Sequence, residues 1–179
     1  MSGHNKWSKI KHKKAATDAA RSKVFSKHAA YIAVESRKAN GDVNSPGLAA
    51  AIERAKKDSM PKDNIDRAVA KGSGAGGAAI EEVLYEGYGP GGVALLIRAV
   101  TDNNNRTAPE IRHLFSKAGL ELGTPGSAAW AFEKTADGYV PATPMELDDS
   151  AGEKLAEFIE KLEENDDITD VYTAADTSE

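Results

Sequence analysis

Hydrophobic residues in the first part of the chain recur at helical spacing and predict three helices. The first runs from about residue 15 to 39 and ends at Gly41, and the third runs from residue 61 to 72. Between them, Ser45 is placed as the N-cap and Pro46 as the first residue of the second helix. The residues expected to face inward are Val24, Phe25, His28, Ala29 and Ile32, then Leu48, Ala51, Ile52 and Ala55, and finally Ile65, Ala68 and Val69. Short helices with short connections indicate a small helical bundle.

The hydrophobic period changes from 3.6 to 2 after a glycine-rich stretch. We interpret residues 73–79 as a linker, because closely spaced glycines make the backbone flexible. Residues 80–88 and 93–100 then read as strands joined by a short glycine-rich turn, which predicts a hairpin. The linker divides the chain into a helical domain, residues 1–72, and a second domain, residues 80–179.

The second domain continues with alternating helices and strands. A capping box at Thr107–Glu110 is expected to begin a helix that ends at Gly119 and buries Ile111, Leu114, Phe115 and Ala118. Further expected elements are a strand at 126–134 that includes Trp130, an irregular strand at 139–147, a helix at 149–165 with Leu155, Phe158, Ile159 and Leu162 inward, and a strand at 168–173. The order β-α-β occurs twice from residue 93 onward. The expected fold class is therefore α+β, an N-terminal three-helix bundle followed by a ferredoxin-like sandwich of one antiparallel sheet and two helices.

Charge is distributed unevenly between the two predicted domains. Residues 1–72 carry 16 Lys and Arg against 7 Asp and Glu, whereas residues 73–179 carry 7 against 21, so the overall net charge of −5 conceals a dipolar molecule. This asymmetry is typical of a polyanion-binding end attached to another part. A basic but merely solvated surface is the alternative interpretation.

The basic N-terminal segment supplies the candidate nucleic-acid contacts. They are His4, Lys6, Trp7, Lys9, Lys11, His12, Lys13, Lys14, Arg21, Lys23 and Lys27. About six phosphate contacts would give a log–log salt slope of roughly −4 to −5. Trp7 among lysines favours stacking on an unpaired base. Its alternative role is to anchor the segment to the helical bundle.

The sequence contains few residues that indicate a metal, cofactor or ligand site. The chain has no cysteine, and no set of residues at metal-ligand spacing, so we expect no metal and no cofactor. The turn after Tyr85 and Tyr88 lacks the Lys-Ser/Thr of a phosphate-binding loop, and these tyrosines are candidate partner contacts. Asp102, Asn103 and Arg106 lie where a strand is expected to meet a helix, and are candidate ligand or partner contacts as well.

We do not expect an enzyme. Asp102, Arg106, Glu110 and His113 resemble an acid–base cluster, but no nucleophile with a partnered base accompanies them. Catalysis by Asp102, Arg106 and His113 is therefore the least favoured of three functional interpretations. The chain also contains no apolar run of about 18 residues, so we predict a cytoplasmic protein with no membrane contact.

Several motifs, in their order and spacing, resemble the YebC/PmpR family. They are residues 3–7 (GHNKW), 10–16 (IKHKKAA), 60–65 (MPKDNI), 85–92 (YEGYGPGG), 101–107 (TDNNNRT), 123–134 and 171–176. The resemblance covers nearly the whole chain, with one departure. Members of the family have a further domain of roughly sixty residues after the Phe-Glu-Lys strand, and here it is missing near residues 134–139. Residues 135–138 would close the gap as a tight turn.

The resemblance implies a non-enzymatic regulator of gene expression that binds nucleic acid. The family has been interpreted both as DNA-binding transcriptional regulators and as translation factors at the ribosome. We favour RNA, with ribosomal RNA and ribosomal proteins as partners, because no helix-turn-helix with a recognition helix is apparent. A basic segment with an aromatic residue suits shaped RNA. A DNA-binding transcriptional regulator is the alternative.

Overall fold

The computed structural model describes residues 18–75 and 79–177. Within them the chain forms two compact units. The helical unit comprises residues 18–82 with 100–104, and the α+β unit comprises residues 83–99 with 105–177. The predicted linker at 73–79 lies partly outside the described residues and stays a prediction. No helix in the described part is both long and apolar enough to cross a membrane.

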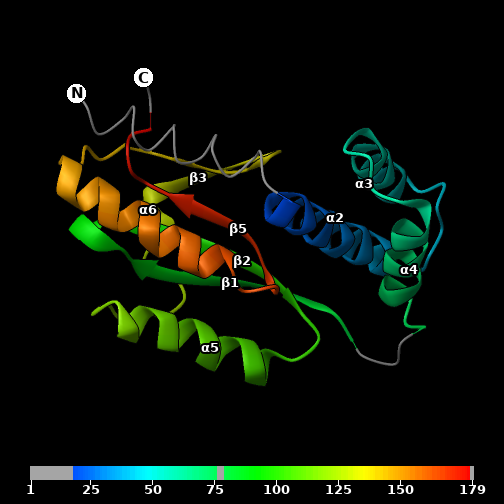
Figure 1. Ribbon diagram of the computed structural model, residues 1–179, viewed down its shortest axis with the longest axis horizontal. Coiled ribbons are helices and arrows are strands. Elements are labelled where there is room, and N and C mark those ends of the chain that lie inside the picture. The colour runs from blue at the N-terminus through cyan, green and yellow to red at the C-terminus, as the bar shows by residue number, and fades with distance from the viewer. Residues whose placement is uncertain (1–17, 76–78, 178–179) are drawn as a thin grey trace. The chain divides into compact units, whose positions relative to one another are not determined.

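The helical unit contains the three predicted helices, α2 (Asp18–Lys38), α3 (Pro46–Lys57) and α4 (Lys62–Gly72), as Figure 1 shows. Their buried side chains form one core: Ile32, Leu48, Ala51, Ala55, Met60, Ile65 and Ala68. Pro46 is the first residue of α3 as expected, although the Ser45 side chain makes no capping hydrogen bond. The inward placement of Val24 was wrong, since its side chain is 40% exposed. Val24 lies about 100° around the helix from Phe25, which packs on the core.

Helices α2 and α4 approach each other closely at Gly72. This glycine is buried, and a Cβ atom built on it would lie 2.7 Å from the Ser36 Cβ and even closer to the carbonyl oxygen of Ala33. The Ser36 hydroxyl donates a 2.6 Å hydrogen bond to the Val69 carbonyl oxygen across the same contact. The contact therefore depends on the absence of a side chain at residue 72.

The α+β unit contains two sheets and two helices. Its three-stranded sheet has the order β1 (Glu81–Tyr88), β2 (Ala94–Thr101), β5 (Ile168–Thr173), and its two-stranded sheet pairs β3 (Phe132–Thr135) with β4 (Gly138–Pro141). The helices are α5 (Asn104–Lys117) and α6 (Asp149–Glu163). The α+β class is confirmed. The expectation of one continuous sheet was wrong: β1 and β5 flank β2, and within the described residues β3 and β4 form a second sheet of their own.

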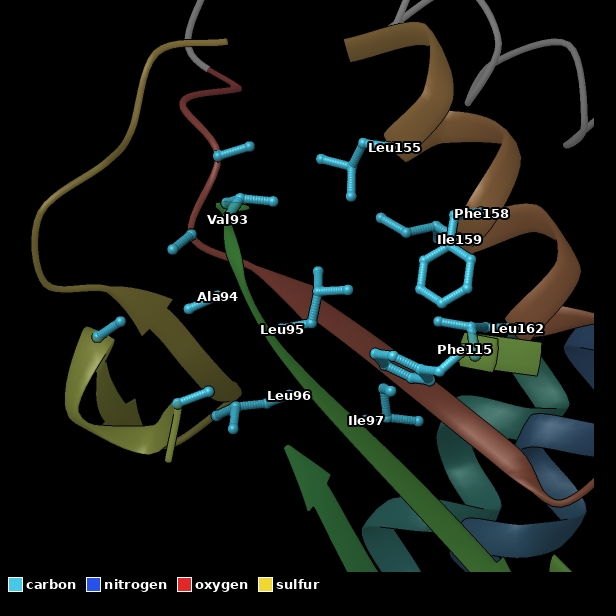
Figure 2. Close-up of a cluster of buried hydrophobic side chains, with 14 of the residues drawn as sticks. Val93, Ala94, Leu95, Leu96, Ile97, Phe115, Leu155, Phe158, Ile159 and Leu162 are labelled. Carbon is cyan, nitrogen blue, oxygen red and sulfur yellow. The ribbon is translucent and has the colours of Figure 1, made fainter. Parts of the chain in front are cut away.

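Strand β2 forms the centre of the α+β core. Leu95, Leu96 and Ile97 are fully buried, and Figure 2 shows Leu95 and Ile97 pointing toward α6 while Leu96 points to the other side of the strand. Phe115 of α5 contacts Phe158 of α6 edge to face, with ring centroids 4.9 Å apart. Side chains on both faces of β2 are thus removed from water, which stabilises the unit by the hydrophobic effect.

Three predicted boundaries within the described residues differ from the structure by three residues or more. Helix α5 begins three residues before Thr107, the strand expected at 126–134 is confined to Phe132–Thr135, and the strand expected at 139–147 ends at Pro141. Ala118, expected to be buried in the helix, is exposed beyond its end. By contrast, β5 has the predicted bounds, and β3 pairs with β4 through Thr135 and Gly138, as expected for a tight turn.

Candidate nucleic-acid interface

Most of the predicted nucleic-acid contacts fall in the first seventeen residues. His4, Lys6, Trp7, Lys9, Lys11, His12, Lys13 and Lys14 lie outside the described residues. Arg21 belongs to α2, but its side chain is outside the described part. Lys23 is half-buried and Lys27 is exposed on the same helix. The structure thus places only Lys23 and Lys27 of this set in detail, and the whole set stays a prediction.

The polar faces of the helical unit carry further cations that sequence reasoning overlooked. Three of them pair with acids on their own helix: Lys38 with Glu35 at 2.8 Å, Lys56 with Glu53 at 3.2 Å, and Lys62 with Asp66 at 2.6 Å. The hydrogen bond and charge of Asp66 raise the pKa of Lys62. These pairs are exposed and already locally neutralised, so they contribute little to a positive potential.

Four other exposed cations of the helical unit make neither an ion pair nor a side-chain hydrogen bond within the described residues. They are Arg37, Arg54, Lys57 and Lys71. Arg54 and Lys57 lie one turn apart on α3, which places them on one face of that helix. In the sequence, the three-residue spacing of Arg54 and Lys57 could have indicated that both lie on one face of a helix. We name the four residues the helical cation set.

Tyr85 and Tyr88, both candidate partner contacts, have different environments on β1. Tyr85 is half-buried and packs against the core of the α+β unit. Tyr88 is 36% exposed, and its hydroxyl donates a 2.6 Å hydrogen bond to the Ser127 carbonyl oxygen. The indole N–H of Trp130 donates to the Tyr88 hydroxyl at 2.9 Å and to the Ser127 carbonyl oxygen at 3.0 Å. We name this arrangement the Tyr88–Trp130 pair.

Trp130 lies outside any strand, in a 3-10 turn at Ala129–Ala131, and its side chain is 72% exposed. Glu86 causes this local structure. Its buried carboxylate accepts hydrogen bonds from the backbone N–H groups of Gly126 at 2.5 Å, Ala128 at 3.0 Å and Ala129 at 2.6 Å. Backbone donors that bond a carboxylate are unable to pair with a neighbouring strand. The expected strand is therefore replaced by a turn that presents Trp130 to solvent.

The same contacts determine the ionisation of Glu86. Burial favours the neutral acid, but the three backbone N–H groups favour the carboxylate more strongly, and together they lower the pKa of Glu86 below its usual value. Glu86 therefore stays charged at neutral pH and acts as a fixed anchor for residues 126–129.

Arg106 is engaged within the protein. One of its terminal nitrogens donates to both carboxylate oxygens of Asp167, at 3.0 and 3.3 Å, and the Thr107 hydroxyl donates to the same carboxylate at 2.7 Å. The predicted capping box was wrong for this reason: Thr107 is fully buried and bonds Asp167 from inside α5 instead of capping the helix. Arg106 thus ties the start of α5 to the segment before β5.

The other residues of this region have local roles. Asp102 and Asn103 are exposed, and the backbone N–H of Asn103 donates to the Thr101 hydroxyl at 2.9 Å. Glu110 accepts a 2.9 Å hydrogen bond from the Asn165 side chain. Within the described residues no group of three or more His, Asp or Glu side chains is placed to hold a metal ion.

The chain was compared with known protein families and proteins. Residues 5–75 match the TACO1/YebC protein N-terminal domain, and residues 80–137 match the TACO1/YebC second and third domain. A protein of Trichlorobacter lovleyi named "Probable transcriptional regulatory protein" is 46% identical over 176 residues, which cover 97% of this chain and 70% of that protein. A protein of Desulforapulum autotrophicum with the same description is 54% identical over 136 residues, but the match spans only 55% of its length.

A solved structure agrees with the fold. The crystal structure of a conserved hypothetical protein from Aquifex aeolicus superimposes with a TM-score of 0.80 at 31% sequence identity, covering 90% of this chain and 93% of that chain.

The chain is shorter than relatives of this kind. Its alignment with a Geobacter sulfurreducens protein, also named as a probable transcriptional regulatory protein, is 37% identical over 239 positions and covers 99% of the chain and 97% of the relative. About sixty of those positions therefore have no counterpart among the 179 residues of this chain. The predicted shortening is confirmed. Its position near residues 134–139 stays a prediction.

Proposed function

The chain belongs to the TACO1/YebC family, and we propose that it is a non-enzymatic regulator of gene expression that binds nucleic acid through its basic N-terminal half. The observation that carries this proposal is the excess of Lys and Arg in residues 1–72, to which the exposed helical cation set contributes four residues. When exposed cations without acidic partners bind the phosphates of a nucleic acid, counterions are released from those phosphates. This release contributes binding affinity that does not depend on base recognition. A cytoplasmic location is part of the proposal.

DNA-binding transcriptional regulation is the first form of this proposal. The names of the relatives support it, since each is called a probable transcriptional regulatory protein. Helices α3 and α4 are joined by only four residues, Asp58 to Pro61, a length found in helix-turn-helix motifs. In this form α4 would approach DNA, and the cations around it would contact the backbone.

Binding to structured RNA at the ribosome is the second form, and the polar face of α4 favours it. Asp63 and Asp66 are exposed on that helix beside Lys62 and Arg67. Carboxylates at the surface of a recognition helix would face DNA phosphates unfavourably. A shaped RNA site can be bound through phosphates and stacking, without a recognition helix in a groove. Ribosomal proteins are further partners in this form.

Two measurements separate these forms. The protein is titrated into labelled duplex DNA and into a labelled RNA hairpin at the same ionic strength, and its sedimentation with ribosomes is followed in moderate salt. Tighter, sequence-selective duplex binding without ribosome sedimentation supports the transcriptional form. Ribosome sedimentation with preference for the hairpin supports the RNA form. Absence of binding to all three contradicts the proposal as a whole.

The basic N-terminal segment gives a direct prediction. Replacing Lys9, Lys11, Lys13 and Lys14 by Ala should weaken nucleic-acid binding about ten- to a hundredfold at low salt, because up to four phosphate contacts are lost. The log–log salt slope should become less steep by about 3. Fluorescence anisotropy of a labelled duplex or hairpin, measured over a series of salt concentrations, gives both values.

A matched control changes the charge equally in the α+β unit. Lys117, Lys134, Lys154 and Lys161 are exposed there, and their joint replacement by Ala removes the same four charges. We expect this variant to bind no more weakly than the wild type. Equal losses in the two variants would mean that net charge alone, and not the basic segment, governs binding.

A further inference from the structure

The Tyr88–Trp130 pair is an exposed aromatic surface that the core of the protein does not use. Trp130 is 72% exposed, whereas Trp side chains are usually mostly buried. Its exposure is enforced by the fold, because Glu86 holds Gly126, Ala128 and Ala129 in the turn that precedes it. The exposed ring is thus produced by a specific set of buried hydrogen bonds.

The pair is also rigid in orientation. The only polar group of the indole, its N–H, bonds the Tyr88 hydroxyl and the Ser127 carbonyl oxygen, and the Tyr88 hydroxyl bonds the same carbonyl oxygen. A partner therefore need not satisfy the indole N–H, and it meets a ring whose rotamer is already fixed. A fixed aromatic side chain loses little conformational entropy on binding, which is a property of residues that dominate protein interfaces.

Charge around the pair indicates what kind of partner fits. The segments that build and adjoin the site, residues 79–97, 119–135 and 138–147, contain one cation, Lys134, against six acids, Glu81, Glu82, Glu86, Glu121, Glu133 and Glu146. The acids at exposed positions include Glu121 and, on β3, Glu133. A nucleic acid that stacked a base on Trp130 would bring phosphates to segments in which acids outnumber cations. A cationic partner would be attracted by the same surface.

We propose that the Tyr88–Trp130 pair is a docking site for an arginine- or lysine-rich segment of a protein partner, with a cationic side chain over the face of the indole. Arginine fits best, since its planar guanidinium stacks on aromatic rings and is more weakly hydrated than an ammonium group. The surrounding carboxylates supply the long-range attraction, and the aromatic face supplies the specific contact. This proposal does not depend on the nucleic-acid binding proposed above.

The test uses the full chain and defined peptides. An arginine-glycine repeat peptide carrying a fluorescent label is titrated with the wild-type protein, and a lysine-glycine and a serine-glycine peptide are titrated for comparison. We expect the arginine peptide to bind tightest, and Trp130→Ala to weaken its binding about tenfold. Trp130→Phe keeps an aromatic face, and we expect its affinity for the arginine peptide to fall about threefold or less. In a Trp7→Phe background Trp130 is the remaining tryptophan, and its emission should change on peptide binding.

Controls separate this contact from general attraction to an acidic protein. Val43 is an exposed apolar residue of the helical unit, and Val43→Ala should bind the arginine peptide like the wild type. Equal affinity of Trp130→Ala and wild type for the arginine peptide would overturn the proposal. It would also be overturned if a labelled oligouridylate bound more tightly than the peptide and lost its affinity in Trp130→Ala, because the site would then stack nucleobases. Thermal unfolding of each variant shows that the fold is retained, as an exposed side chain leads us to expect.

Discussion

Replacing Gly72 by alanine should destabilise the helical unit by about 3 kcal/mol. The added methyl group would lie 2.7 Å from the Ser36 Cβ, 2.9 Å from the Ala33 carbonyl carbon and closer still to the Ala33 oxygen. Two of these atoms belong to the backbone of α2, so the helices have to separate. Separation also lengthens the hydrogen bond from Ser36 to Val69. The gain of about 1 kcal/mol in helix propensity is too small to compensate.

The measurement is chemical denaturation followed by circular dichroism, and the chain offers a control within the same unit. Gly47 in α3 also has a close neighbour, but that neighbour is the flexible end of the Glu35 side chain, which can move away. Gly47→Ala should therefore be nearly neutral. If Gly72→Ala and Gly47→Ala unfold at the same denaturant concentration, the close approach of α2 and α4 is absent in solution.

Replacing Glu86 by alanine should destabilise the α+β unit by about 3 kcal/mol. The substitution leaves three backbone N–H groups, those of Gly126, Ala128 and Ala129, without their acceptor. Hydrogen bonds to a charged group contribute about 1.5–3 kcal/mol each, and part of the loss is recovered where water reaches the freed donors. The turn that presents Trp130 should loosen as well. A change in tryptophan emission in the Trp7→Phe background would report this loosening.

The pH dependence of stability tests the same anchor. The pKa of Glu86 is lowered in the folded state, so the unfolded state binds the proton more strongly. The stabilisation from the Glu86 carboxylate is therefore complete above the unfolded pKa of about 4.5 and is lost as the pH falls through the lower folded value. Glu86→Gln should remove this component of the acid dependence, whereas Glu133→Gln, at an exposed position, should leave it intact. The same acid dependence in wild type and Glu86→Gln would exclude Glu86 as its source.

The sequence pattern predicted most of the elements because their periodicity is local information. Helix α6 buries the predicted Leu155, Phe158, Ile159 and Leu162, and β5 has the predicted bounds. Two of the wrong boundaries involve partners distant in sequence. Thr107 bonds Asp167, sixty residues away, and residues 126–129 bond Glu86, about forty residues away. No pattern near these residues in the sequence indicates such contacts.

The candidate sites show the same division between local and distant information. Charge asymmetry predicted a basic end, and helical spacing could have added the helical cation set. Arg106 was a candidate contact because it lies where a strand was expected to meet a helix, and the structure pairs it with Asp167. Trp130 was expected inside a strand, and only the Glu86 contacts explain why it is exposed.

The salt dependence of nucleic-acid binding by the helical unit tests the central claim most directly. The wild type is compared with a variant in which the helical cation set, Arg37, Arg54, Lys57 and Lys71, is replaced by Ala, using the ligand that the wild type prefers. We predict weaker binding and a log–log salt slope that is less steep by about 2 to 4. The variant with Lys117, Lys134, Lys154 and Lys161 replaced should keep the wild-type slope. An unchanged slope in the helical variant, or an equal reduction in both variants, would contradict the assignment of nucleic-acid binding to this unit.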